Sequence, residues 1–163
     1  FIKHLESGAV DGNVDGIDVA TGLVAGNIID VVNGVVSVQP EELMDKENNR
    51  LFMAPSVMRM YKAALVKANM YHFNIESGRP GMEDFYIPGT NIMATSTPGL
   101  SGVSDMYLSQ EDNLVMGTDL VDEASTTFEL FYDKSSRSLK FTDEFKAGTN
   151  VIFKGQVVAF KLV

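Results

Sequence analysis

The stretch from Arg50 to Met70 reads RLFMAPSVMRMYKAALVKANM, and its pattern decides the fold. It opens with the apolar run Leu51–Met53, which is too short for a helix and therefore predicts a buried strand. Pro55 suits the first position of a helix, and Asn69 is expected to close that helix in the left-handed region. Between them, apolar residues recur at the spacing of one helical face: Val57, Met60, Tyr61, Ala64, Leu65 and Ala68. The pattern predicts a strand and a helix of about four turns that packs on a sheet.

The composition indicates a globular chain with a real core. Of its 163 residues, 45% are hydrophobic and 21% are charged, which suits one domain or two small lobes that share a core. The formal net charge of −9 disfavours direct nucleic-acid binding, because such binding needs a basic face. The sequence has no run of about 18 apolar residues, so we predict no membrane-spanning segment. The chain begins with Phe1 and shows no basic-then-apolar leader, so we expect it to be part of a longer protein.

The residue types limit the chemistry that the chain can perform. It contains no cysteine, which excludes disulfides and zinc–thiolate sites. His4 and His72 are the only histidines, so a multi-histidine metal site is not expected. We therefore expect no cofactor.

The other segments predict an α+β protein. We expect a helix at about 22–33 that ends near Asn33-Gly34, and a single helical turn at 40–42. From residue 125 the alternating pattern predicts an antiparallel meander with turns at 133–136 and 147–150, and with Val157–Phe160 as its last strand. Further strands are predicted at 71–75, 85–87, 91–94, 106–108 and 113–117.

One segment near the N-terminus is similar to a calcium-binding loop. Asp11, Asn13 and Asp15 have the spacing of the first three ligands. The twelfth position, where a bidentate glutamate is needed, is Gly22. We interpret the segment as a solvated turn and do not expect it to bind a metal.

Two further clusters are similar to catalytic sites but lack essential groups. In Gly99–Gly102 the residue two positions after Ser101 is Val103, where a nucleophile elbow has glycine, and no histidine follows to activate the serine. Three carboxylates lie close together in sequence: Asp119, Asp122 and Glu123. They could in principle serve as an acid–base pair, but acids in a loop more often only keep that loop solvated. We therefore expect no enzymatic activity.

A series of short motifs follows in order from residue 21 to the end. The motifs are a helix at Ile28–Asn33, LFMAPSVMRMYKAAL (Leu51–Leu65), GTNIM (Gly89–Met93), MGTDLVDE (Met116–Glu123), FELFYDKSSRSLKFTDEFKAGTNVIF (Phe128–Phe153) and VVAFKL (Val157–Leu162). In this order they resemble the major capsid protein of tailed bacteriophages, the Hong Kong 97-like fold. Ala54 stands where that family often has an Asn cap, so the helix after it should be less well capped.

The resemblance implies a structural protein and a domain division. Residues 1–20 would form a loop and a short strand that lead into the first domain. Residues 21–124 would form an axial-type domain, and residues 125–163 would form antiparallel strands of a peripheral-type domain. The family's N-terminal arm, extended loop and spine helix are not visible, which implies a C-terminal part of a capsid subunit. Its partners would be other copies of the subunit, in an icosahedral shell that encloses DNA, assembled in the bacterial cytoplasm, without specific nucleic-acid or membrane contact.

Two polar loops, Glu76–Asp84 and Thr95–Asp105, are the candidates for contacts between subunits, because exposed loops usually carry binding. The candidate residues are Glu76, Arg79, Glu83, Asp84, Thr95, Ser101 and Asp105. The alternative is a small secreted or surface module that binds a carbohydrate or another ligand. An upstream arm and long helix would favour the capsid, and a signal peptide would favour the module.

Overall fold

The computed structural model describes residues 9–12, 22–69, 84–118, 129–142 and 147–162. The helical elements are α2 (Ile28–Ser37), α3 (Glu41–Met44), α4 (Pro55–Lys67), η1 (Pro98–Leu100), η2 (Glu111–Asn113) and η3 (Lys154–Gln156). The strands are β1 (Val10–Asp11), β2 (Asn49–Met53), β3 (Phe85–Tyr86), β4 (Met93–Ser96), β5 (Met106–Gln110), β6 (Leu114–Thr118), β7 (Glu129–Asp133), β8 (Ser138–Thr142), β9 (Ala147–Val151) and β10 (Val158–Phe160).

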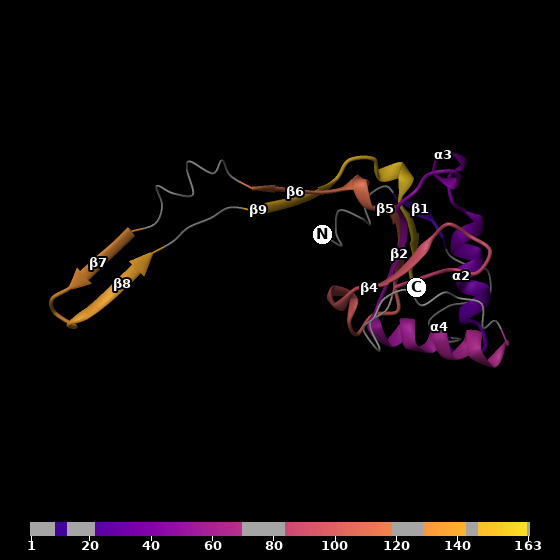
Figure 1. Ribbon diagram of the computed structural model, residues 1–163, viewed down its shortest axis with the longest axis horizontal. Helices are drawn as coiled ribbons and strands as arrows, with labels where there is room; N and C mark the ends of the chain where they lie inside the picture. The colour runs from indigo at the N-terminus through magenta and orange to yellow at the C-terminus, as the bar shows by residue number, and fades with distance from the viewer. Residues whose placement is uncertain (1–8, 13–21, 70–83, 119–128, 143–146, 163) are drawn as a thin grey trace.

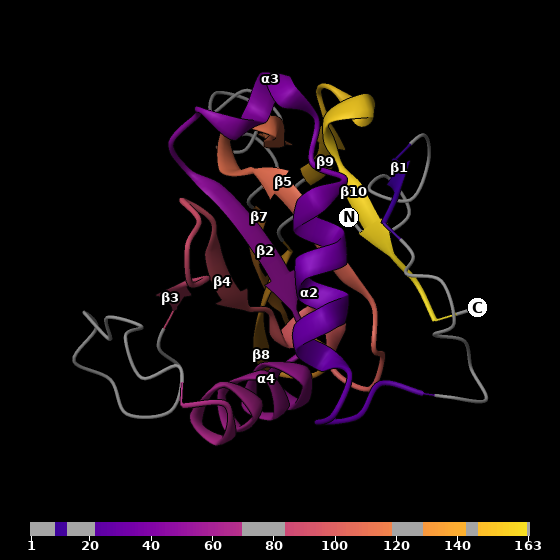
Figure 2. The ribbon, with the colours of Figure 1, turned by 90° about the vertical axis from the view of Figure 1, so that its right-hand side faces the viewer.

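A mixed six-stranded sheet with the order β1-β10-β5-β2-β4-β3 forms the centre of the molecule. Strand β2 pairs antiparallel with β5 and parallel with β4. Leu51 and Met53 are buried in it, which confirms the buried strand predicted at Leu51–Met53. Figure 2 shows α2 lying in front of this sheet and α4 crossing below it. The fold is therefore α+β, with its core between the sheet and the two helices.

Helix α4 confirms most of the prediction for its segment. It starts with Pro55, has no side-chain cap at Ala54, and is followed by Asn69 in the left-handed region at φ 56°. The buried residues include Val57, Tyr61, Ala64 and Leu65 as expected. The predicted stripe is wrong at its edges: Ala68 is exposed and Met60 is half-buried, whereas Met58, which we did not predict, is buried.

Helix α2 lies later in the chain than the predicted helix. It covers Ile28–Ser37 and continues through Gly34, which we expected to end it. A glycine inside a helix costs about 1 kcal/mol relative to alanine. Burial of Val35, which is 0% exposed, offsets this cost because it extends the buried stripe of Ile28, Val31 and Val32 by one more turn. Upstream, the Asn27 side chain accepts from the Val24 N–H and donates to the Gly22 carbonyl, which holds residues 22–27 outside the helix.

The C-terminal strands pair differently from the predicted meander. Strand β9 occupies Ala147–Val151, where we expected a turn, and pairs antiparallel with β6. Strand β10 returns to the central sheet, between β1 and β5. The C-terminal strand is buried on both faces, with all three residues buried, so it suits a central position better than an edge of a solvated hairpin.

The strands between them form an arm, which we define as β6, β7, β8 and β9. Strand β6 pairs with β9 and β7 pairs with β8, each as a two-stranded antiparallel unit. Figure 1 shows the arm extending from the sheet on the side opposite α2, with β7 and β8 at its far end. Within the described residues, the arm thus consists of strands without a second layer.

Leu65→Ala should destabilise the protein by about 2–5 kcal/mol, because Leu65 is 1% exposed and its removal leaves a cavity between α4 and the sheet. Denaturant unfolding measures the difference. The matched control is Val66→Ala, which changes a 46% exposed neighbour and should cost less than about 0.5 kcal/mol. Equal stability of the two variants would contradict the organising role of α4.

Tyr61 makes the stability sensitive to alkaline pH. It stacks on Phe85 with ring centroids 5.7 Å apart, and burial raises the pKa of Tyr61 from 10.0 to about 12. Between these two values the unfolded chain loses the tyrosine proton while the folded chain retains it, so stability falls as pH rises. At about pH 11, Tyr61→Phe should remove about 1 kcal/mol of the alkaline loss measured by urea unfolding. Tyr86→Phe, at a 47% exposed position, should leave the alkaline slope unchanged.

Candidate assembly surfaces

The predicted loop residues Asp84 and Thr95 meet at one arginine inside the subunit. Arg50 on β2 donates from Nη1 to Asp84 Oδ2 at 3.3 Å and to Thr95 Oγ1 at 3.2 Å. Its Nε donates to Glu111 Oε2 at 2.7 Å. The arginine therefore ties the segments before β3, in β4 and after β5 to one strand. In the sequence, this cluster is indicated only by the position of Arg50 directly before the apolar run Leu51–Met53.

Of the other candidates, the structure describes Ser101 and Asp105, and these two lie apart from Arg50 in the chain. Ser101 is exposed after η1, where its N–H donates to the Pro98 carbonyl, and Asp105 is half-buried before β5. Glu76, Arg79 and Glu83 lie outside the described residues, as do the carboxylates Asp119, Asp122 and Glu123. Of the four candidates that lie in the described residues, the structure thus brings Asp84 and Thr95 together, through Arg50.

The calcium look-alike is only partly described. Asp11 is exposed at the end of β1, whereas Asn13 and Asp15 lie outside the described residues. Among the residues that are described, no group of three histidines or carboxylates is placed to hold a metal ion. The same part of the chain contains no helix with the length and apolarity needed to cross a membrane.

The hairpin of β7 and β8 has one apolar face, which follows from the alternation of the sequence once the register of the two strands is known. In antiparallel strands, directly opposed residues point to the same side. Leu130 is opposite Phe141 and Tyr132 is opposite Leu139, so these four side chains share one face. Their exposed fractions are 57% for Leu130, 57% for Tyr132, 65% for Leu139 and 73% for Phe141. We call these four residues the apolar face.

The opposite face of the hairpin is mixed. Phe131 lies opposite Lys140, and Asp133 lies opposite Ser138. The alternation of the sequence from 128 to 132 contained this information, but it becomes clear only when the register of both strands is known. The hairpin therefore has one face suited to water and one suited to burial.

The turn between β7 and β8 is fixed by one carboxylate. Asp133 accepts hydrogen bonds from the Ser135 N–H at 2.9 Å, from the Ser135 and Ser136 hydroxyls, and from Lys140 Nζ. The Lys140 ammonium and the two serines hold the pKa of Asp133 well below its usual range. The contribution of these bonds is therefore present above the ordinary carboxyl pKa and is lost only as pH falls through the depressed value.

At the other end of the arm, Asn113 joins the arm to the central sheet. Its side-chain Nδ2 donates to the Phe153 carbonyl at 2.9 Å, and its Oδ1 accepts from the Phe153 N–H at 2.7 Å. Nδ2 also lies 3.3 Å from Ser109 Oγ on β5, and the Asn113 carbonyl accepts from the Ile152 N–H at 3.1 Å. Asn113 is only 3% exposed, so these bonds fix the direction in which the arm leaves the sheet.

A groove lies beside this junction. Its volume is about 690 Å³, and we call it the root groove. The residues that line it are Pro40, Glu41, Glu42, Ile152, Phe153, Lys154, Gly155 and Gln156. Ile152 is 51% exposed and Phe153 is 59% exposed, so the groove presents two large apolar side chains to solvent. On the α3 side it is acidic, and Gln156 Nε2 donates to Glu42 Oε2 at 3.3 Å across it.

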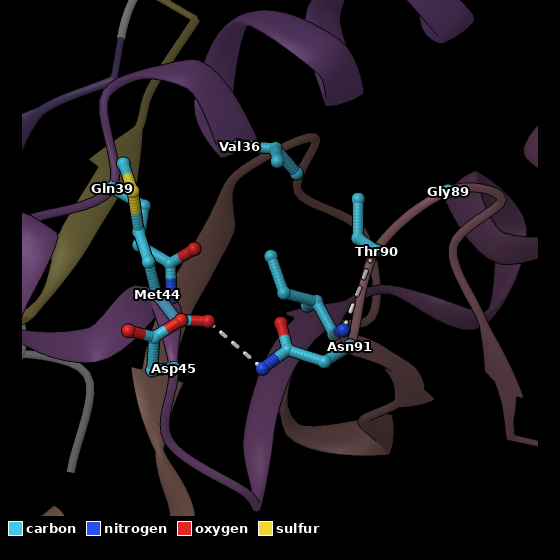
Figure 3. A pocket seen from close by; sticks show the side chains of 8 residues that line it. Val36, Gln39, Met44, Asp45, Gly89, Thr90 and Asn91 are labelled. Atoms are coloured by element: carbon cyan, nitrogen blue, oxygen red, sulfur yellow. Dashed lines mark hydrogen bonds between the residues drawn. The ribbon is translucent and has the colours of Figure 1, made fainter.

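A second groove, of about 770 Å³, lies between α3 and the turn that connects β3 to β4. Figure 3 shows the Asn91 side chain reaching across it toward Met44. Asn91 Nδ2 donates to the Met44 carbonyl at 3.0 Å and to the Lys46 carbonyl at 2.9 Å. Nearby, buried Asn49 donates to the carbonyls of Leu43 and Lys46. The two asparagines use their amide groups to hold the α3–β2 connection, so we interpret this groove as a structural junction.

Comparisons with known proteins relate this arrangement to phage capsids. No protein-family model matches the sequence, and no curated protein matches it either. Among solved structures, a chain from Mycobacterium phage Che8 aligns with a TM-score of 0.59 and 10% sequence identity, over 96% of this chain and 54% of that one. A chain of the cyanophage Pam1 capsid asymmetric unit aligns with a TM-score of 0.51 and 13% identity, over 95% of this chain and 54% of that one.

These likenesses define the class of fold. The chain has the α+β fold of phage capsid proteins, which confirms the resemblance inferred from the order of the motifs. At 10 and 13% identity the likeness concerns the fold, and the chain spans about half the length of each structure that it matches.

Asn113→Ala should destabilise the junction by about 1–3 kcal/mol, because it leaves the part-buried Phe153 N–H without its acceptor. Denaturant unfolding measures the loss, and hydrogen exchange should show faster exchange of the Phe153 amide. Asn150→Ala, at an exposed position of β9, is the matched control and should leave both unchanged. Unchanged exchange at Phe153 in the Asn113 variant would contradict the role given to the side-chain amide.

Proposed function

We propose that this protein is a major capsid subunit, or part of one, which assembles with copies of itself into an icosahedral phage or prophage shell that encloses DNA. The proposal rests on the fold of phage capsid proteins and assigns the chain a structural role without enzymatic activity. It locates the protein in the virion, after assembly in the bacterial host cytoplasm.

The apolar face of the hairpin is the single observation on the chain's own surface that supports assembly between copies. Four large apolar side chains, each at least 57% exposed, lie together on one side of two strands. An isolated two-stranded hairpin is marginally stable in water, and clustered exposed apolar residues mark interaction sites. A subunit that is covered by neighbouring copies in a shell has a reason to keep such a face.

The charge of the chain suits partners of its own kind better than nucleic acid. A shell that encloses DNA with little specific contact gains from a net charge of −9, because the acidic surface does not adhere to phosphate. We propose no membrane partner and no specific nucleic-acid partner.

The domain division and the loop contacts remain part of the proposal. We retain residues 21–124 as axial-type and residues 125–163 as peripheral-type, although β6 pairs within the arm and β10 within the central sheet. The loop residues stay candidates for contacts around a capsomer axis, although Asp84 and Thr95 already bond to Arg50.

Expression of the complete reading frame that contains residues 1–163 tests the function. We expect shell-like particles in negative-stain microscopy and a large assembly in light scattering. Residues 1–163 alone should remain monomeric or weakly associated, because one contact would bury less than the roughly 1,000 Å² of a stable interface. A reading frame whose product stays monomeric at all salt and crowding conditions would contradict the proposal.

The double variant Leu139→Ser/Phe141→Ser, made in the complete reading frame, tests the role of the apolar face. It removes two side chains of that face and should abolish particles while circular dichroism shows a folded protein. Phe131→Ser is the matched control, because Phe131 is 48% exposed on the opposite face of the same hairpin. Particles that survive the double variant would remove the apolar face from assembly.

A further inference from the structure

The arm has two exposed apolar surfaces, and they lie at its opposite ends. The apolar face belongs to β7 and β8, whereas Ile152 and Phe153 belong to the root groove beside α3. Figure 1 shows the hairpin at the far end of the arm from α3. Because the hairpin lies at the other end of the arm, it does not cover the root groove of its own chain. A contact between the two surfaces must therefore join two chains.

The two surfaces also differ in charge. Segment 129–142 carries three cations, Lys134, Arg137 and Lys140, against two carboxylates, in a chain whose net charge is −9. Lys140 is paired with Asp133, and among the described residues no ion pair involves Lys134 or Arg137. The tip of the hairpin is therefore cationic.

The groove has the complementary character. Glu41 and Glu42 line its α3 side and are both exposed. The ion pairs found among the described residues involve neither of them. Lys154 lies at the η3 side of the groove, so the two glutamates place the acidic side of the groove at α3.

From these observations we infer that the hairpin of one copy docks into the root groove of the next copy. The inference rests on the proposed function, which brings copies together, and it names the surfaces they use. The apolar face would cover Ile152 and Phe153, while Lys134 and Arg137 would approach Glu41 and Glu42. Both partners would thereby remove large apolar side chains from water.

This contact is heterologous, since a different surface of each chain takes part. Repetition of such a contact closes a ring or continues from copy to copy, which a shell-forming subunit requires. A symmetric contact between two apolar faces would bring two cationic tips into one interface without using the acidic groove. Charge complementarity therefore favours the contact of a hairpin with a root groove over the symmetric contact of two hairpins.

Charge reversal tests the pairing. Variant H carries Lys134→Glu/Arg137→Glu, and variant G carries Glu41→Lys/Glu42→Lys. Each alone places like charges at every contact and should lower the association of the protein made from the complete reading frame, measured by light scattering at low salt, by about tenfold or more. An equimolar mixture of H and G should restore it, because each hairpin then meets a groove of opposite charge. Failure of the mixture to associate better than either variant would overturn the inference.

Cysteine cross-linking identifies the surfaces directly, because the chain itself has no cysteine. A mixture of Leu139→Cys and Ile152→Cys chains, treated with a short bismaleimide at the highest soluble concentration, should give a 139–152 cross-link by mass spectrometry. Phe131→Cys, on the opposite face of the hairpin, is the control and should not cross-link to Ile152→Cys. A 139–139 product alone, or no product, would overturn the inference.

The two proposals fail separately. Particles from the complete reading frame without a 139–152 cross-link would leave the capsid function in place and contradict the contact of the hairpin with the root groove. A 139–152 cross-link from a protein that never forms particles would retain the contact and contradict the shell.

Discussion

A two-stranded ribbon cannot bury one of its own faces, and this constraint governs the arm. In the central sheet, strands are covered by α2 and α4, so that Leu51 and Leu108 are fully buried. The hairpin of β7 and β8 has the same kind of side chains at Leu130 and Leu139, but more than half of each is exposed. The difference is in the layers present and not in the residue types, so the arm depends on another molecule or segment for its second layer.

The junction at Asn113 decides whether such a second layer meets the arm in a defined geometry. A side-chain amide that both donates to and accepts from the Phe153 peptide replaces a pair of strand hydrogen bonds where the chain leaves the sheet. Because Asn113 is buried, these part-buried bonds face less competition from water than fully exposed ones. Asn113 thus anchors the start of β6 and the end of β9 to the core, and the turn at Asp133 fixes the far end of the hairpin.

Local patterns predicted the elements, whereas long-range pairing decided the surfaces. The helix from Pro55 and the strand around Leu51 followed from spacing and from one proline, and the order of short motifs indicated the capsid fold. The ends of α2 could not be predicted in this way, because burial of Val35 outweighs the local preference of Gly34. The apolar face depends on the register of Leu130 with Phe141, and neither residue alone distinguishes a buried from an exposed face.

The distribution of charge determines which end of the arm other copies of the chain approach most easily. An acidic chain repels its own copies at long range, and this repulsion is screened beyond about 8–10 Å at ordinary ionic strength. A cationic tip reduces the repulsion locally, next to the residues that have apolar area to bury. Copies that approach through Lys134 and Arg137 therefore meet less resistance than copies that approach through acidic surfaces. Apolar burial supplies the strength of a contact, and the placement of a few charges selects which surfaces make it.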